Sequence, residues 1–110
     1  MITINSYLNE LFGIFAPSGD EVVDPIINKM NSVINKIYKS CDHIKDDNQK
    51  QICIKEKIIK IKKDVRLELV KAISQCEGRR PCHKIIAKNT VQIDSEVSEL
   101  KSEISKLKKS

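Results

Sequence analysis

The sequence predicts an all-α protein: a disulfide-stapled bundle of about four helices with a long central helix and a long C-terminal helix. Three observations lead to this class. The 110 residues include no Trp, three Gly and three Pro, and only 4% are aromatic. Apolar residues recur at helical rather than alternating spacing. Four cysteines in so short a chain can form two staples. We therefore expect one domain over residues 1–110.

The first two helices are expected at residues 3–15 and 25–41. Residues 3–15 carry apolar side chains at spacings of four, three and four, which predicts an amphipathic helix. Asp24 and Pro25 offer an N-cap followed by a proline at the first helical position, so we place the next helix start there. The apolar stripes of the two segments are Ile4, Leu8, Leu11 and Phe15, and Ile26, Met30, Val33, Ile37 and Cys41.

The central helix is expected over residues 47–76, a stretch without Gly or Pro. Its main apolar stripe is Ile54, Ile58, Ile61, Val65, Leu69, Ala72 and Cys76. A second line of Ile52, Ile59, Val70 and Ile73 predicts contacts on two sides. Gly78 suits the left-handed position after this helix, and Pro81 suits the start of the last helix, residues 81–108.

The last segment carries a heptad seam. One position holds Ile86, Ile93, Leu100 and Leu107, and the other holds Thr90, Val97 and Ile104. Two interpretations stay open. The segment can fold back on residues 47–76 of the same chain as a hairpin. Alternatively, Glu96 and Glu103 can pair with Lys101 and Lys108 of a second chain in a parallel homodimer. The hairpin is favoured because the tether gives a high effective concentration.

The cysteines fall into two pairs around the central segment. Cys53 and Cys76 would lie about 35 Å apart on one helix, so the four thiols cannot meet at one point. If residues 25–41 pack antiparallel to residues 47–76, the disulfides are Cys41–Cys53 and Cys76–Cys82. A metal interpretation, with His43 and His83 beside the thiols, is weaker because the spacings match no common zinc module.

Paired cysteines in a short chain indicate an oxidising compartment. We therefore expect a secreted, extracellular protein. The N-terminal residues lack the basic and apolar regions of a signal peptide, which suggests a mature chain that begins with a start Met. No apolar run approaches the length needed to span a bilayer.

The net charge of +5 is concentrated in residues 39–88, which carry fourteen basic and seven acidic side chains. With no nucleophile, base and orienting group in sight, we expect a non-enzyme without cofactors. The lysines of the central segment are expected on a solvated face or on an anion-binding surface for acidic protein or polysaccharide. Nucleic acid is disfavoured because no aromatic residues interleave the charges. The candidate partner-binding residues are Lys60, Lys63, Arg66, Arg79 and Arg80.

Cys76-Glu-Gly-Arg-Arg-Pro-Cys82 is a second local candidate. Two arginines in a small closed loop could enter the acidic pocket of a trypsin-like protease. The alternative is ordinary helix punctuation, since Gly and Pro are common at such turns.

The size, the helical content, the start Met and the short-long-short spacing of the four cysteines resemble the small helical salivary proteins of blood-feeding insects, such as the anophensin and albicin group of mosquitoes. The resemblance implies a secreted antagonist of host defence that acts on complement or contact activation. It carries over no residue roles.

Two rival classes stay open. Insect chemosensory proteins share a short-long-short cysteine layout and imply a secreted helical carrier of small apolar ligands, which would need a cavity. A bacterial periplasmic immunity or lysis-control protein is the third possibility. Few aromatic residues and one strongly basic segment favour protein recognition over a carrier.

Overall fold

The computed structural model describes residues 19–109, and these form three long helices. They are α2 (Gly19–Ser40), α3 (Asp47–Lys71), which continues as the short 3-10 helix η1 (Ala72–Cys76), and α4 (Arg80–Lys109). The expected all-α class, with a long central helix and a long C-terminal helix, is confirmed. The helix expected at residues 3–15 lies outside the described residues.

Helix α2 begins at Gly19, six residues before the start that Asp24 and Pro25 indicate, so that expected boundary is wrong. Val22 and Val23 are both buried in the core and hold the first turns against α3 and α4. Pro25 lies on the exposed side of the helix. Water can therefore solvate the carbonyl that loses its amide partner to the proline, which lowers the cost of a proline inside a helix.

Side-chain and backbone caps define the ends of α3. The carboxylate of Asp46 accepts a hydrogen bond from the Gln49 amide at 2.9 Å, which satisfies one free donor of the first turn. At the other end, Glu77 has φ 51° and Gly78 has φ 80°. The left-handed step expected at Gly78 thus begins one residue earlier, at a residue that pays a steric cost for it. Together these two residues reverse the chain into α4.

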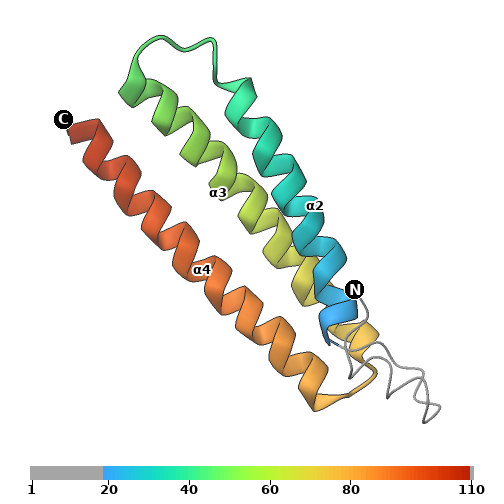
Figure 1. The fold of residues 1–110 in the computed structure, drawn as a ribbon. Helices are drawn as coiled ribbons and strands as arrows, with labels where there is room; N and C mark the ends of the chain where they lie inside the picture. The colour runs from blue at the N-terminus through green and yellow to red at the C-terminus, as the bar shows by residue number, and fades with distance from the viewer. Residues whose placement is uncertain (1–18, 110) are drawn as a thin grey trace.

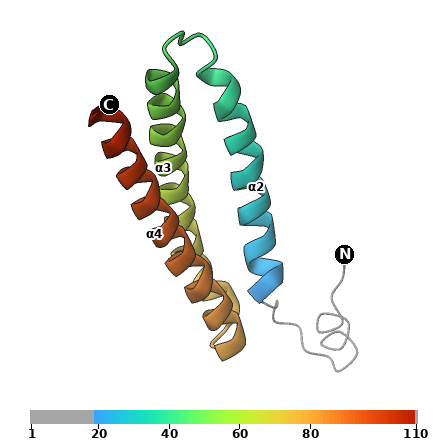
Figure 2. The same ribbon diagram turned by 60° about the vertical axis from the view of Figure 1, so that its left-hand side comes forward.

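The three helices run antiparallel to their chain neighbours (Figure 1). The α2–α3 loop and the C-terminal end of α4 lie at one end of an elongated molecule of 57 × 22 × 20 Å. The α3–α4 turn and the first turn of α2 lie at the other. Helix α3 packs against both other helices, whereas α2 contacts α4 less extensively. Figure 2 shows α2 diverging from α4 toward the α2–α3 loop.

The core follows the apolar stripes. Leu69 and Ile86 are fully buried at the centre of the larger cluster, which extends along α3 and α4 to Ile104. A smaller cluster near the α2–α3 loop contains Ile37, Ile54 and Ile58. The four cysteines form two disulfides, Cys41–Cys53 and Cys76–Cys82, with Cα–Cα distances of 6.2 and 5.5 Å. Each closes one turn, and each such closure stabilises the fold by about 2–4 kcal/mol.

Candidate protein-binding surface

Apart from Lys50, whose Nζ lies 3.4 Å from Asp42 Oδ1 in the α2–α3 loop, the basic side chains of α3 divide into two sets. The inner set points toward α4 and is paired with it. Lys62 is only 7% exposed, and its Nζ lies 3.4 Å from a Glu96 carboxylate oxygen. Lys55 Nζ lies 2.7 Å from Glu103 Oε2. The expectation that all these lysines lie on a solvated face is therefore wrong for Lys62, which is buried between α3 and its partner on α4.

Arg66 extends the same set, with Nε 2.7 Å from Asp94 Oδ1. The partners on α4 fall in residue number as those on α3 rise, so the pairs fix an antiparallel register. One further pair joins Lys108 to Glu56 at 3.7 Å. Arg66, one of the five candidate binding residues, is thus already engaged within the chain.

These pairs also decide how the heptad seam is used. Glu96 and Glu103, which a parallel dimer would pair with a second chain, bind lysines of α3 instead. The apolar seam residues Ile86, Ile93, Val97 and Ile104 are buried against the rest of the chain. Within the described residues, the hairpin interpretation accounts for the seam.

The outward set is different. Lys60, Lys63 and Lys71 are exposed, and none has an ion-pair partner among the described residues. Lys57 donates a hydrogen bond to Ser40 Oγ at 3.0 Å. From Lys57 to Lys71 the set extends about 21 Å along the helix. We call these four lysines the outward lysines.

Arg79 and Arg80 lie at the turn beyond η1. Lys63 lies thirteen residues before Cys76, roughly 20 Å along α3 and η1, and Arg79 follows the turn beyond it, so the five candidate residues do not form one cluster. Arg79 is partly buried in the turn, and Arg80 is already the first residue of α4. The two arginines therefore do not form one extended segment of the kind that a protease-binding loop would present.

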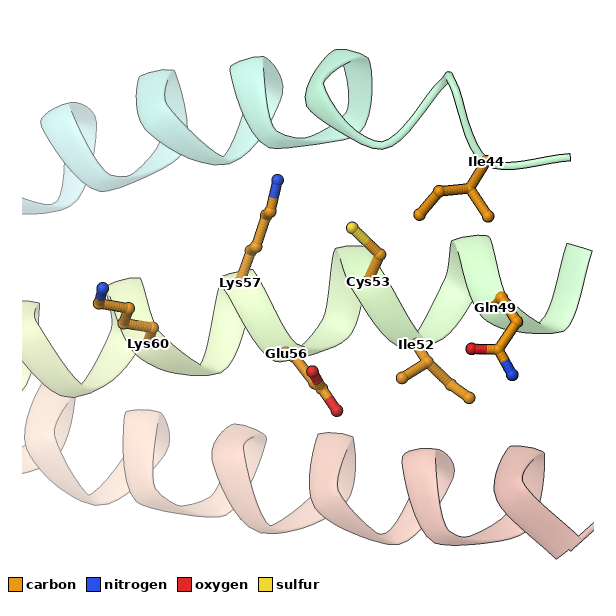
Figure 3. Close-up of a pocket in the computed structure, with 7 residues that line it drawn as sticks. All are labelled: Ile44, Gln49, Ile52, Cys53, Glu56, Lys57 and Lys60. Atoms are coloured by element: carbon orange, nitrogen blue, oxygen red, sulfur yellow. The ribbon is translucent and has the colours of Figure 1, made fainter. Parts of the chain in front are cut away.

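A shallow hollow of about 440 Å³ opens on α3 beside the Cys41–Cys53 disulfide (Figure 3). Ile44 and Ile52 give it apolar walls, and Lys57 and Lys60 stand at its edge. Glu56 also lines it but points toward α4, where it pairs with Lys108. Two of the outward lysines, Lys57 and Lys60, therefore lie next to the apolar side chains of Ile44 and Ile52.

A second hollow, of about 330 Å³, lies between α2 and α4. Ile34 and Tyr38 of α2 face Leu100 of α4 across it, and Ile58 and Lys62 of α3 form its floor. Glu96, Glu99 and Glu103 border it. It is a groove open to solvent rather than an enclosed cavity.

Sequence reasoning missed the exposed apolar side chains of α3 and α4. Val70 and Ile73, expected in a second buried line, are 44% and 36% exposed. Leu67 and Val91 belong to no stripe and are more exposed still. The sequence does offer a clue to Leu67 and Val91. Both are flanked by charged or polar residues, and neither falls at a position of an apolar repeat. The second line is buried only in its first half, at Ile52 and Ile59.

Comparison with protein-family models, with curated proteins and with solved structures gave no match for this chain. All four cysteines are in disulfides, which is consistent with an oxidising compartment. None of the helices in the described part of the chain is long and apolar enough to cross a membrane.

Proposed function

We propose that this protein is a secreted, non-enzymatic binding module that antagonises a host extracellular cascade, complement or contact activation, by binding one of its proteins. The observation that carries the proposal is the separation of charge on α3. The inner cations neutralise carboxylates of α4, whereas Lys60, Lys63 and Lys71 remain available on the opposite face.

A cation without an intrachain partner can steer an acidic protein during encounter, and its attraction falls with salt. Here the cations stand on a helix whose two ends are tied by disulfides. The backbone of such a helix loses little conformational entropy on binding. The choice of complement and contact activation rests on the resemblance to the salivary proteins and on the indicated compartment.

The groove between α2 and α4 supports a second candidate, a carrier of small apolar ligands. Its volume of about 330 Å³ is at the lower end of ligand sites, and Ile34, Ile58 and Leu100 give it apolar surface. Its floor also holds the ion-paired Lys62, and its border is acidic. This polar lining is less suited to an apolar ligand than an enclosed cavity would be.

Assays of complement and of contact activation, run side by side on serum and plasma, test the proposal. Micromolar protein should slow one of them. Charge reversal of Lys60 and Lys63, or of Arg79 and Arg80, should weaken inhibition more than reversal of Lys106 and Lys109 near the C-terminus. A soluble polyanion that restores the cascade would implicate basic side chains, and the charge-reversal variants identify which set. If neither cascade slows and a fluorescent fatty acid binds tightly, the protein is a carrier.

A further inference from the structure

The exposed apolar side chains of this protein are not scattered. Among the described residues, five large hydrophobic side chains are exposed, and four of them lie in the half of the bundle nearer the Cys76–Cys82 disulfide. Val91 is 67% exposed and Leu67 is 58% exposed. With Val70 and Ile73 they form what we call the apolar ridge. The fifth, Tyr38, lies in the α2–α4 groove.

The register of α3 against α4 places Leu67, Val70 and Val91 within about one helical turn of one another, and Ile73 lies about a turn further toward the Cys76–Cys82 disulfide. The ion pair between Arg66 and Asp94 joins the two helices beside it. Leu67 directly follows Arg66, and Val70 lies one turn further along α3. Helix α4 runs antiparallel to α3. Val91, three residues before Asp94, therefore lies at a height between Leu67 and Val70. All four side chains are exposed, so the ridge lies on the outer surface of α3, η1 and α4.

The charges around the ridge are mostly positive. Lys63 and Lys71 lie one turn before and one turn after Leu67 on α3. On α4, Lys84 and Lys88 precede Val91 and are exposed, and no carboxylate occurs in that helix before Asp94. Asp94 is paired with Arg66. On α3, Asp64 adds one exposed carboxylate, and Glu68 faces Lys29 on the α2 side at 4.0 Å.

We propose that the apolar ridge docks an acidic amphipathic helix of the partner protein. Leucine-like side chains of that helix would cover Leu67, Val70 and Val91, and its carboxylates would pair with Lys63, Lys71 and Lys88. This inference rests on the proposed function and specifies the chemistry of the partner. A few residues that become fully buried near the centre of an interface carry most of its binding energy, and charges at the rim set specificity and the association rate.

Two other occupants fit less well. A second copy of this chain would bring the same lysines opposite one another, because a two-fold interface pairs a surface with itself. An anionic membrane would be attracted by the lysines, but the ridge lacks the aromatic side chains that anchor proteins at the lipid–water boundary. The acidic helix satisfies both the apolar side chains and the charges.

The probe for this test is a labelled synthetic peptide that is cross-linked to hold it helical, with Leu at positions i, i+3, i+4 and i+7, Glu beside the Leu stripe and Ala or Gln elsewhere. Binding to the whole protein is followed by fluorescence anisotropy. The double substitution Leu67→Gln and Val91→Gln should weaken binding at least tenfold, and so should raising the salt concentration. Tyr38→Gln, an exposed change in the other groove, should leave it unchanged. Gln is a good helix former, and circular dichroism should show intact folding in all variants.

Three outcomes would overturn the docking site: no peptide binding to the unmodified protein, equal binding by the double variant, or stronger binding to phosphatidylserine vesicles than to the peptide. The result is separate from the test of the proposed function. If a cascade slows but the peptide does not bind, the docking site is wrong and the antagonist function still holds. Peptide binding without inhibition of either cascade removes the antagonist and leaves a binding module for acidic helices.

Discussion

The two faces of α3 use the same residue types for opposite purposes. Lys62 is buried and paired with Glu96, whereas Lys60, two residues earlier, is exposed and has no ion-pair partner in the described part of the chain. Leu69 is fully buried, whereas Leu67 is 58% exposed. The face that meets α4 and the core builds the fold, and the outward face leaves Lys60 and Leu67 exposed to solvent. Because each pair contains the same residue type on opposite faces, the same substitution at both positions compares the two faces directly.

The leucine pair should show the largest difference. Replacing Leu69 by Ala should lower the free energy of unfolding by about 3–5 kcal/mol, because it leaves a cavity in the core. Leu67→Ala should change it by no more than about 0.5 kcal/mol. Urea unfolding followed by circular dichroism measures both. If the two variants are equally destabilised, Leu67 is part of the core and cannot serve as a binding residue.

The lysine pair sharpens the comparison for charge. Lys62→Glu would place a like charge beside Glu96 in a buried position, and we expect a loss of about 3 kcal/mol. Lys62→Met should be close to neutral, because Glu96 is partly exposed and can be hydrated. Lys60→Glu should change stability by no more than about 0.5 kcal/mol and should affect binding instead. Similar unfolding curves for Lys62→Glu and Lys60→Glu would contradict the assignment of inner and outward sets.

The smallest change in stability is expected for Arg66, which lies between the inner and the outward face of α3. The pair of Arg66 and Asp94 is short but about half exposed, so Arg66→Gln should lower stability by about 0.2–1 kcal/mol. Lys63→Gln, a change of similar size on the outward face, is the control and should be neutral. The difference should shrink as salt is added, because exposed charges are screened. A loss for Arg66→Gln that persists in high salt would show that packing of its side chain, rather than charge, stabilises the register.

The class of fold could be predicted from the sequence because periodicity and the lack of helix breakers act locally. The start of α2 could not, because Asp24 and Pro25 imitate a helix start, and only the burial of Val22 and Val23 shows that the helix is already under way. Proline position is a local signal, whereas burial depends on the other helices. The sequence alone therefore could not show that burial of Val22 and Val23 outweighs the helix-start signal of Asp24 and Pro25.

The candidate site shows the same limit. Lys60 and Lys63 lie outside the apolar stripe in the sequence and are exposed in the structure. Lys62 also lies outside it, yet its stem runs along the core to Glu96, a residue more than thirty positions away. Arg66, one of the candidate binding residues, forms an ion pair with Asp94 that the sequence does not indicate. The register of α3 against α4 determines which cations are paired with carboxylates and which are exposed. This register cannot be predicted from the apolar pattern of one helix.

The positions of the two disulfides determine what a cut in the backbone would do. Lys45 lies between Cys41 and Cys53, and the Arg79–Arg80 bond lies between Cys76 and Cys82. These are basic residues at or beside turns, where trypsin-like proteases can cut the backbone. A break at either place would leave the flanking helices joined by sulfur, so no fragment would separate until a reductant was added. The nicked protein would migrate as one species without reductant and as two with it, while its helices kept their packing.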